Sequence, residues 1–160
     1  LWVMPGMAGA LWICVEAEDS ARVVASLRIE PEGTFSLRFI NSIYLAPVKE
    51  TYRYVPSEGI VAVLVESPSA GVFEYYGLVP DGSGASAVYT RASEIRVRSS
   101  DYHHHRLSTG GEEISLNGLV PGGEPLVIRV KETCSGVSLL WGQPLNCDIL
   151  SAIYSIRQEN

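Results

Sequence analysis

Residues 35–54, FSLRFINSIYLAPVKETYRY, decide the fold, because they read as a β-strand, a polar turn and a second β-strand. Phe35, Leu37 and Phe39 alternate with polar residues, and this period of two is typical of a strand with one buried face. A second strand is expected over residues 48–55. The segment therefore predicts an antiparallel hairpin with an apolar face on each strand.

Similar patterns lie on both sides of this hairpin. Residues 60–65 are continuously apolar, which predicts a central strand covered on both faces. Residues 23–29, 95–98 and 126–131 predict further strands, and Gly/Pro/Ser-rich loops separate them. About eight short strands at this spacing predict an all-β, single-domain antiparallel β-sandwich, with a β-barrel as the second choice.

The composition and the Gly-rich loops argue against two classes of function. The chain of 160 residues is 46% hydrophobic, which suits one globular domain with a core. Its net charge is -6 and its Lys and Arg residues do not cluster, so non-specific nucleic-acid binding is not expected. The Gly-rich loops at 77–82 and 118–123 are not followed by Gly-Lys-Ser/Thr, which excludes a phosphate-binding loop of that type.

The two ends of the chain differ from its middle. Residues 1–15 carry no charge, and a stretch of this length suits a signal peptide or the end of a membrane anchor. We expect residues 1–10 to be a remnant of such a segment, followed by a β-sandwich domain at 11–131 and a C-terminal extension at 132–160. Residues 148–158 suit either a short helix or a strand. An extracytoplasmic location, periplasmic or at the cell surface, is the resulting expectation.

The cysteines also bear on the cellular compartment of the protein. Cys134 and Cys147 lie 13 residues apart in a Gly- and Pro-containing segment. A disulfide between them would stabilise the extension by roughly 3 kcal/mol in an oxidising compartment. Two separate buried thiols are the other interpretation, since free cysteine packs as a small apolar residue.

Two polar residues interrupt the apolar faces of the hairpin. Asn41 continues the face of Phe35, and Glu50 shares a face with Tyr52. A carboxylate removed from water needs a partner, so Glu50 is a candidate for a ligand-binding or catalytic group. Alternatively, Glu50 reaches solvent at the rim of the sheet. A third interpretation is a purely structural contact, in which Glu50 accepts hydrogen bonds from the turn or from the hydroxyl of Tyr44 or Tyr52.

A run of three histidines is a second candidate site. On an extended strand His103 and His105 would share a face, a spacing that can bind a divalent metal with a carboxylate from elsewhere. Adjacent serines and Asp101 favour a solvated turn instead. Nucleophilic catalysis by Ser42 with one of these histidines and Asp101 or Glu50 is a further hypothesis, although no Gly-x-Ser-x-Gly elbow supports it.

One segment resembles a known family. Residues 35–43, FSLRFINSI, followed by 47–52, PVKETY, resemble the hallmark of the bacterial and archaeal family called domain of unknown function 1850. That hallmark is F-x-L-x-[YF]-x-H-S-V, a spacer, then P-V-x-E and an aromatic residue. Gly71 ends a sequence similar to the family's Gly-Ala-Gly turn, and the resemblance covers about residues 11–131. Asn41 stands where the family has His, and an amide cannot titrate near neutral pH.

The resemblance implies an exported or membrane-anchored protein encoded near tripartite ATP-independent periplasmic (TRAP) transporters of the TAXI type. It implies no catalytic residues and no cofactor. We therefore expect a non-enzymatic accessory protein that binds transporter or solute-binding subunits, or a small carboxylate. The expected binding residues are Asn41, Ser42, Glu50, Tyr52 and Gly71. The alternatives are a hydrolase or isomerase with Glu50 as general acid or base, and a structural immunoglobulin-like surface module.

Overall fold

Strands form most of the molecule in the computed structural model, which describes residues 10–30, 33–98, 104–134, 137–138 and 144–145. The helical segments are α1 (Ala70–Tyr76) and one 3-10 turn, η1 (Pro121–Gly123). The strands are β1 (Leu11–Ala17), β2 (Val23–Ile29), β3 (Thr34–Asn41), β4 (Ala46–Val55), β5 (Gly59–Glu66), β6 (Ala85–Ala92), β7 (Ile95–Arg98), β8 (Arg106–Thr109), β9 (Glu112–Ser115), β10 (Pro125–Lys131), β11 (Val137–Ser138) and β12 (Pro144–Leu145).

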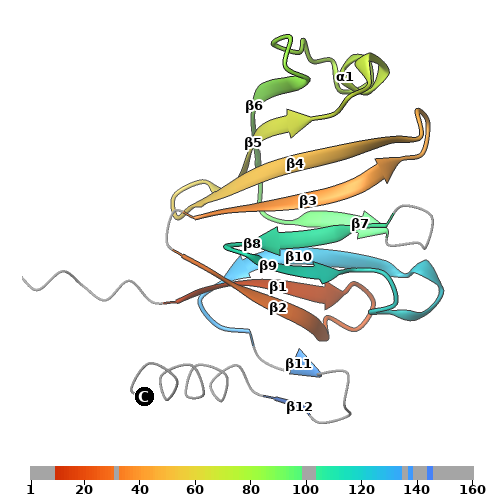
Figure 1. Cartoon of the computed structure of the whole chain (residues 1–160). Coiled ribbons are helices and arrows are strands. Elements are labelled where there is room, and N and C mark those ends of the chain that lie inside the picture. Colours follow the sequence, from red (N-terminus) through yellow and green to blue (C-terminus); the bar gives the residue numbers. More distant parts are fainter. Residues whose placement is uncertain (1–9, 31–32, 99–103, 135–136, 139–143, 146–160) are drawn as a thin grey trace, which may run out of the picture.

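Two sheets of unequal width pack against each other (Figure 1). The narrower sheet has four strands in the order β2-β1-β10-β7, and the wider has six in the order β6-β5-β4-β3-β8-β9. Neighbouring strands are antiparallel in both sheets. The sheets do not close into a barrel, so the prediction of an all-β sandwich is confirmed.

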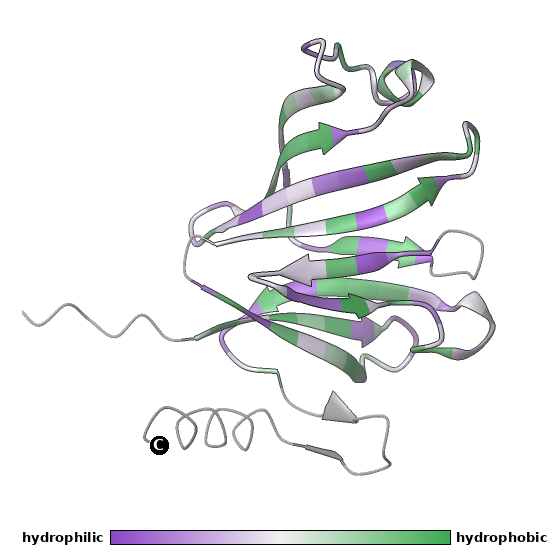
Figure 2. Ribbon diagram, viewed as in Figure 1, coloured by the Kyte–Doolittle hydropathy of each residue, from purple (hydrophilic) through white to green (hydrophobic). Residues whose placement is uncertain are grey.

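The core lies between the sheets and uses the faces that the sequence indicates. Phe35 and Leu37 of β3 are each 2% exposed, and Phe35 stacks on Tyr52 of the paired strand β4. Leu126 and Ile128 of β10 are fully buried opposite them in the same core cluster. Figure 2 shows hydrophilic and hydrophobic bands along β3 and β4, and a largely hydrophobic β5. The apolar run at 60–65 is thus an inner strand, paired on both edges by β4 and β6.

The disulfide differs from the expected Cys134–Cys147 pair, because Cys134 is bonded to Cys14. The reason is the long-range pairing of β1 with β10, which places Trp12 opposite Lys131. The chain leaving β10 therefore passes beside the middle of β1, where Cys14 and Cys134 pack with Val23. Cys147 lies outside the described residues.

The helix α1 was not expected from the sequence. It has seven residues and ends at Gly77, whose φ of 66° is the left-handed conformation that glycine adopts at helix ends. Within the described segments, no helix has the length and apolar character needed to cross a membrane. The expected N-terminal remnant, apart from residue 10, and the ambiguous segment at 148–158 fall outside the described residues.

Candidate functional site

A cavity of about 420 Å³ opens between the sheets where the narrower one ends. The four-stranded sheet stops at β7, whereas the six-stranded sheet continues to β6, so the inner faces of β5 and β6 are incompletely covered (Figure 1). Register shifts in β4 and β5, between Thr51 and Tyr52 and between Ala62 and Leu64, mark irregularities that bend strands at such positions. The apolar part of the wall comprises Ile60, Ala62, Val65, Leu78, Val88, Ala92 and Ile95.

A carboxylate bonded to two phenols forms the polar part of this wall. Glu50 pairs with Leu37 across β3 and β4 and so faces the interior, together with Tyr52 two residues further on. The Tyr52 hydroxyl donates to Glu50 Oε2. The hydroxyl of Tyr76, the last residue of α1, donates to Glu50 Oε1 over 2.5 Å. All three side chains line the cavity.

Both phenols stay protonated at neutral pH. Burial, and then the charge of Glu50 and its hydrogen bond, raise the pKa of Tyr52 far above its usual range. Burial, followed by the hydrogen bond to Glu50 and its charge, raises the pKa of Tyr76 in the same way. Each hydroxyl hydrogen is therefore held by Glu50, and the phenol oxygens keep only lone pairs to offer to another molecule.

Asn41 and Ser42 lie away from this cluster. Asn41 is opposite Ala46 at the end of β3, four residues beyond Leu37, which is roughly 13 Å along the strand from the level of Glu50. Its Oδ1 accepts hydrogen bonds from the backbone N–H of Ile43 and of Tyr44, each over 3.0 Å. Ser42 is exposed in the same turn. The contacts of Asn41 are those of a turn-stabilising residue.

Replacing Asn41 by alanine is expected to lower the free energy of unfolding by about 1 kcal/mol, because the partly buried backbone N–H groups of Ile43 and Tyr44 lose their acceptor. Asn41→Asp keeps the acceptor oxygen and should stay close to the wild type. Urea denaturation of both variants measures the difference. Equal losses in the two variants would contradict the assignment of Asn41 to the turn.

Gly71 also has a packing role. It lies in α1 against the ring of Tyr44, and a Cβ at this position would overlap that ring. The glycine thus lets α1 rest on the β3–β4 turn. Gly71 does not line the cavity. Among the expected binding residues, Glu50 and Tyr52 do.

Of the histidine run, His105 lies by the wider sheet. His105 is 8% exposed, stacks on Phe39 at 5.3 Å between ring centroids, and its carbonyl accepts the N–H of Leu116. His103 and Asp101 fall outside the described residues. Within the part of the chain that the structure describes, no three His, Cys, Asp or Glu side chains are grouped to hold a metal ion.

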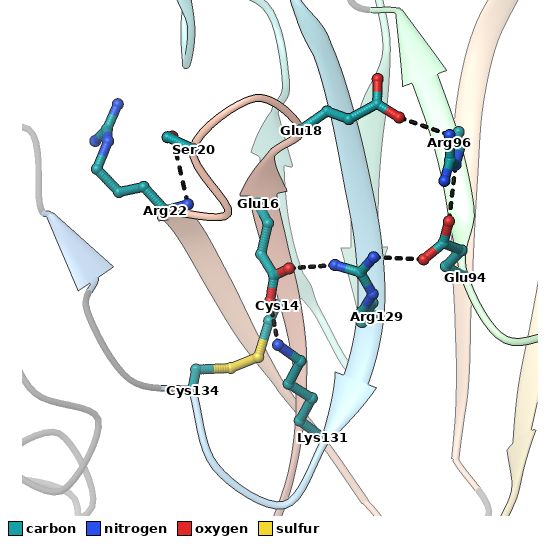
Figure 3. A network of polar contacts seen from close by, with 10 residues as sticks. All are labelled: Cys14, Glu16, Glu18, Ser20, Arg22, Glu94, Arg96, Arg129, Lys131 and Cys134. Atoms are coloured by element: carbon teal, nitrogen blue, oxygen red, sulfur yellow. Dashed lines mark hydrogen bonds and ion pairs between the residues drawn. A yellow bond between two sulfur atoms is a disulfide. The ribbon is translucent and has the colours of Figure 1, made fainter.

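A network of ion pairs links side chains on and beside the strands of the narrower sheet (Figure 3). Glu94 and Arg96, which line the cavity, pair with each other over 2.7 Å. Glu94 also accepts a hydrogen bond from Arg129 over 2.5 Å, and Arg129 and Lys131 both bond to the buried Glu16. The two arginines, chiefly through hydrogen bonds, hold the pKa of Glu94 below its usual value.

The sequence contains a signal for only part of this site. Glu16 interrupts an apolar strand in the same way as Glu50 and could have been found by the same reasoning. Tyr76 offers no comparable pattern, because α1 is too short to show helical periodicity. The residue also lies 26 positions after its partner Glu50 in the sequence.

No family model, curated protein or solved structure matches this chain. The resemblance to the domain of unknown function 1850 family stays a prediction from the motif at residues 35–52.

Proposed function

We propose that this protein is a non-enzymatic, extracytoplasmic binding protein that holds a small, largely apolar ligand in the cavity between its sheets. The cavity carries the proposal: its volume of about 420 Å³ is within the range of small-molecule sites, and a few convergent polar groups interrupt an apolar wall. The described residues that line the cavity include no His, Cys or Lys. The two carboxylates of the wall, Glu50 and Glu94, are each held by side chains of the protein, an arrangement that favours binding.

The disulfide supports the proposed location. Bonds such as Cys14–Cys134 persist in oxidising compartments and are rare in the cytosol. The family resemblance adds the proposal that the protein serves a TAXI-type TRAP transporter. Co-purification of a transporter subunit with the tagged protein from native membranes would support this, and wild-type solute uptake in a deletion strain that also yields no such subunit would contradict it.

Filling the cavity tests the binding function directly. Nile red, an uncharged fluorophore, should bind the wild-type protein with increased emission, and Ala62→Phe should weaken this binding by about tenfold or more. Ala62 lines the cavity, so the larger side chain occupies the ligand's space. Fluorescence titration measures the affinity, and thermal denaturation verifies that the variant is folded.

The matched control is Ala87→Phe, which adds the same ring on an exposed position of β6. This variant should bind Nile red as the wild type does. Absence of binding by the wild type, or an equal loss in both variants, would overturn the proposed function. Ala92→Phe, which also lines the cavity, replaces Ala62→Phe if the latter does not fold.

A further inference from the structure

The charge of Glu50 is not balanced by a cation of the protein. Its two described hydrogen-bond partners, Tyr52 and Tyr76, are neutral phenols. The one cationic side chain among the described lining residues is Arg96, whose guanidinium pairs with Glu94 and with Glu18, each over 2.7 Å. Glu50 is half-buried, and a carboxylate partly withdrawn from water without a counter-charge is unfavourable, so the cavity has an unmet preference for a positive group.

The hydrogen-bonding capacity of the cluster points to the same kind of group. A carboxylate has about four acceptor sites, and the phenols use two of them. Because both phenol hydrogens are directed at Glu50, the oxygens of Tyr52 and Tyr76 act only as acceptors toward a ligand. The three side chains together present acceptors and no free donor. A primary ammonium group, with three N–H donors and no acceptor, is complementary to this arrangement.

The rest of the cavity and the overall charge agree with such a ligand. The wall beyond the cluster is aliphatic, contributed by residues such as Ile60, Val65 and Val88, and suits a hydrocarbon body. The net charge of -6 attracts cations and repels anions over longer range. A carboxylate ligand would meet Glu50 and find no donor on Tyr52 or Tyr76.

We propose that the ligand of this cavity is a small primary amine with an apolar body, whose ammonium group binds to Glu50, Tyr52 and Tyr76. This inference rests on the proposed function and names the ligand class for the same cavity. It also replaces the small carboxylate that the family resemblance implies.

Three probes with the same chain length separate the possibilities. Hexylamine, hexanol and hexanoate are titrated into the full chain at pH 7 and followed by calorimetry. Hexylamine should bind about tenfold or more tightly than hexanol, and hexanoate should bind most weakly. Equal affinities for hexylamine and hexanol, or tighter binding of hexanoate, would overturn the amine proposal. Nile red binding that persists in that case would leave the proposed function standing, whereas loss of all binding would remove both.

Two variants locate the amine. Glu50→Gln keeps the shape and an acceptor oxygen but removes the charge, so hexylamine affinity should fall about tenfold and the preference for hexylamine over hexanol should be lost. Tyr76→Phe should cause a smaller fall, because it removes one acceptor and leaves Tyr52 on Glu50. If Glu50→Gln does not fold, Tyr76→Phe decides alone. Undiminished preference for the amine in a folded variant would overturn the assignment.

Discussion

Replacement of both Cys14 and Cys134 by alanine is expected to lower the free energy of unfolding by about 4 kcal/mol, the largest effect among these predictions. The bond joins residues separated by 120 positions, and in the chain-entropy model a long loop gives the greatest restriction of the unfolded chain. Both sulfurs are also buried, so their loss removes packing against Val23. Guanidinium denaturation with intact and reduced protein measures the change.

Cys147 provides the matched control for this experiment. Cys147→Ser should leave the denaturation midpoint of the oxidised protein unchanged, because Cys134 is bonded to Cys14. A large loss in Cys147→Ser together with a wild-type midpoint in Cys14→Ala would instead indicate the Cys134–Cys147 pairing. Peptide mapping of the unreduced protein gives the connectivity independently.

Arg129→Met is expected to lower the free energy of unfolding by about 2 kcal/mol. Arg129 bonds to Glu16 and Glu94 at once, and the side chain of Glu16 is only 4% exposed. Removing one partner of a buried ion pair leaves the other uncompensated, which costs several kcal/mol in fully buried cases. Lys131 still pairs with Glu16 and Arg129 itself is partly exposed, so a smaller value is expected here.

An exposed arginine gives the comparison for Arg129. Arg38 lies on the outer face of β3, 56% exposed, with Glu113 at 3.8 Å. Exposed pairs of this kind contribute between zero and about 1 kcal/mol, so Arg38→Met should be close to neutral when the two methionine variants are compared by urea denaturation. If both methionine variants lose the same stability, the network does not act as a buried tie between the strands of the narrower sheet.

The elements that sequence could predict are those whose signal is local. Alternation predicts the buried face of Phe35, Leu37 and Phe39. Glu50 could be recognised as inward-facing because it alternates in step with Val48 and Tyr52 on its own strand. The partner of Cys134 could not be recognised, because it depends on the pairing of β10 with β1. These two strands are far apart in the sequence. Tyr76 was missed for the same reason, because only tertiary packing brings α1 to Glu50.

The role of Asn41 shows a different limit. Its position on the apolar face was visible, yet a residue at a strand end can turn its side chain back onto the following N–H groups, as Asn41 does toward Ile43 and Tyr44. Strand parity places a side chain on a face but does not give its hydrogen-bond partners. Distance along the strand then separates Asn41 from the cavity.

The bond between Cys14 and Cys134 has a mechanical consequence. Tension applied to the chain outside these two residues is carried across the sulfur–sulfur link, because that link is the shortest covalent path between them. Residues 15–133, which include the whole cavity wall, then carry no covalent load. A pull that would otherwise peel β1 from β10 leaves the cavity unstretched, and the domain behaves under force as a closed covalent ring.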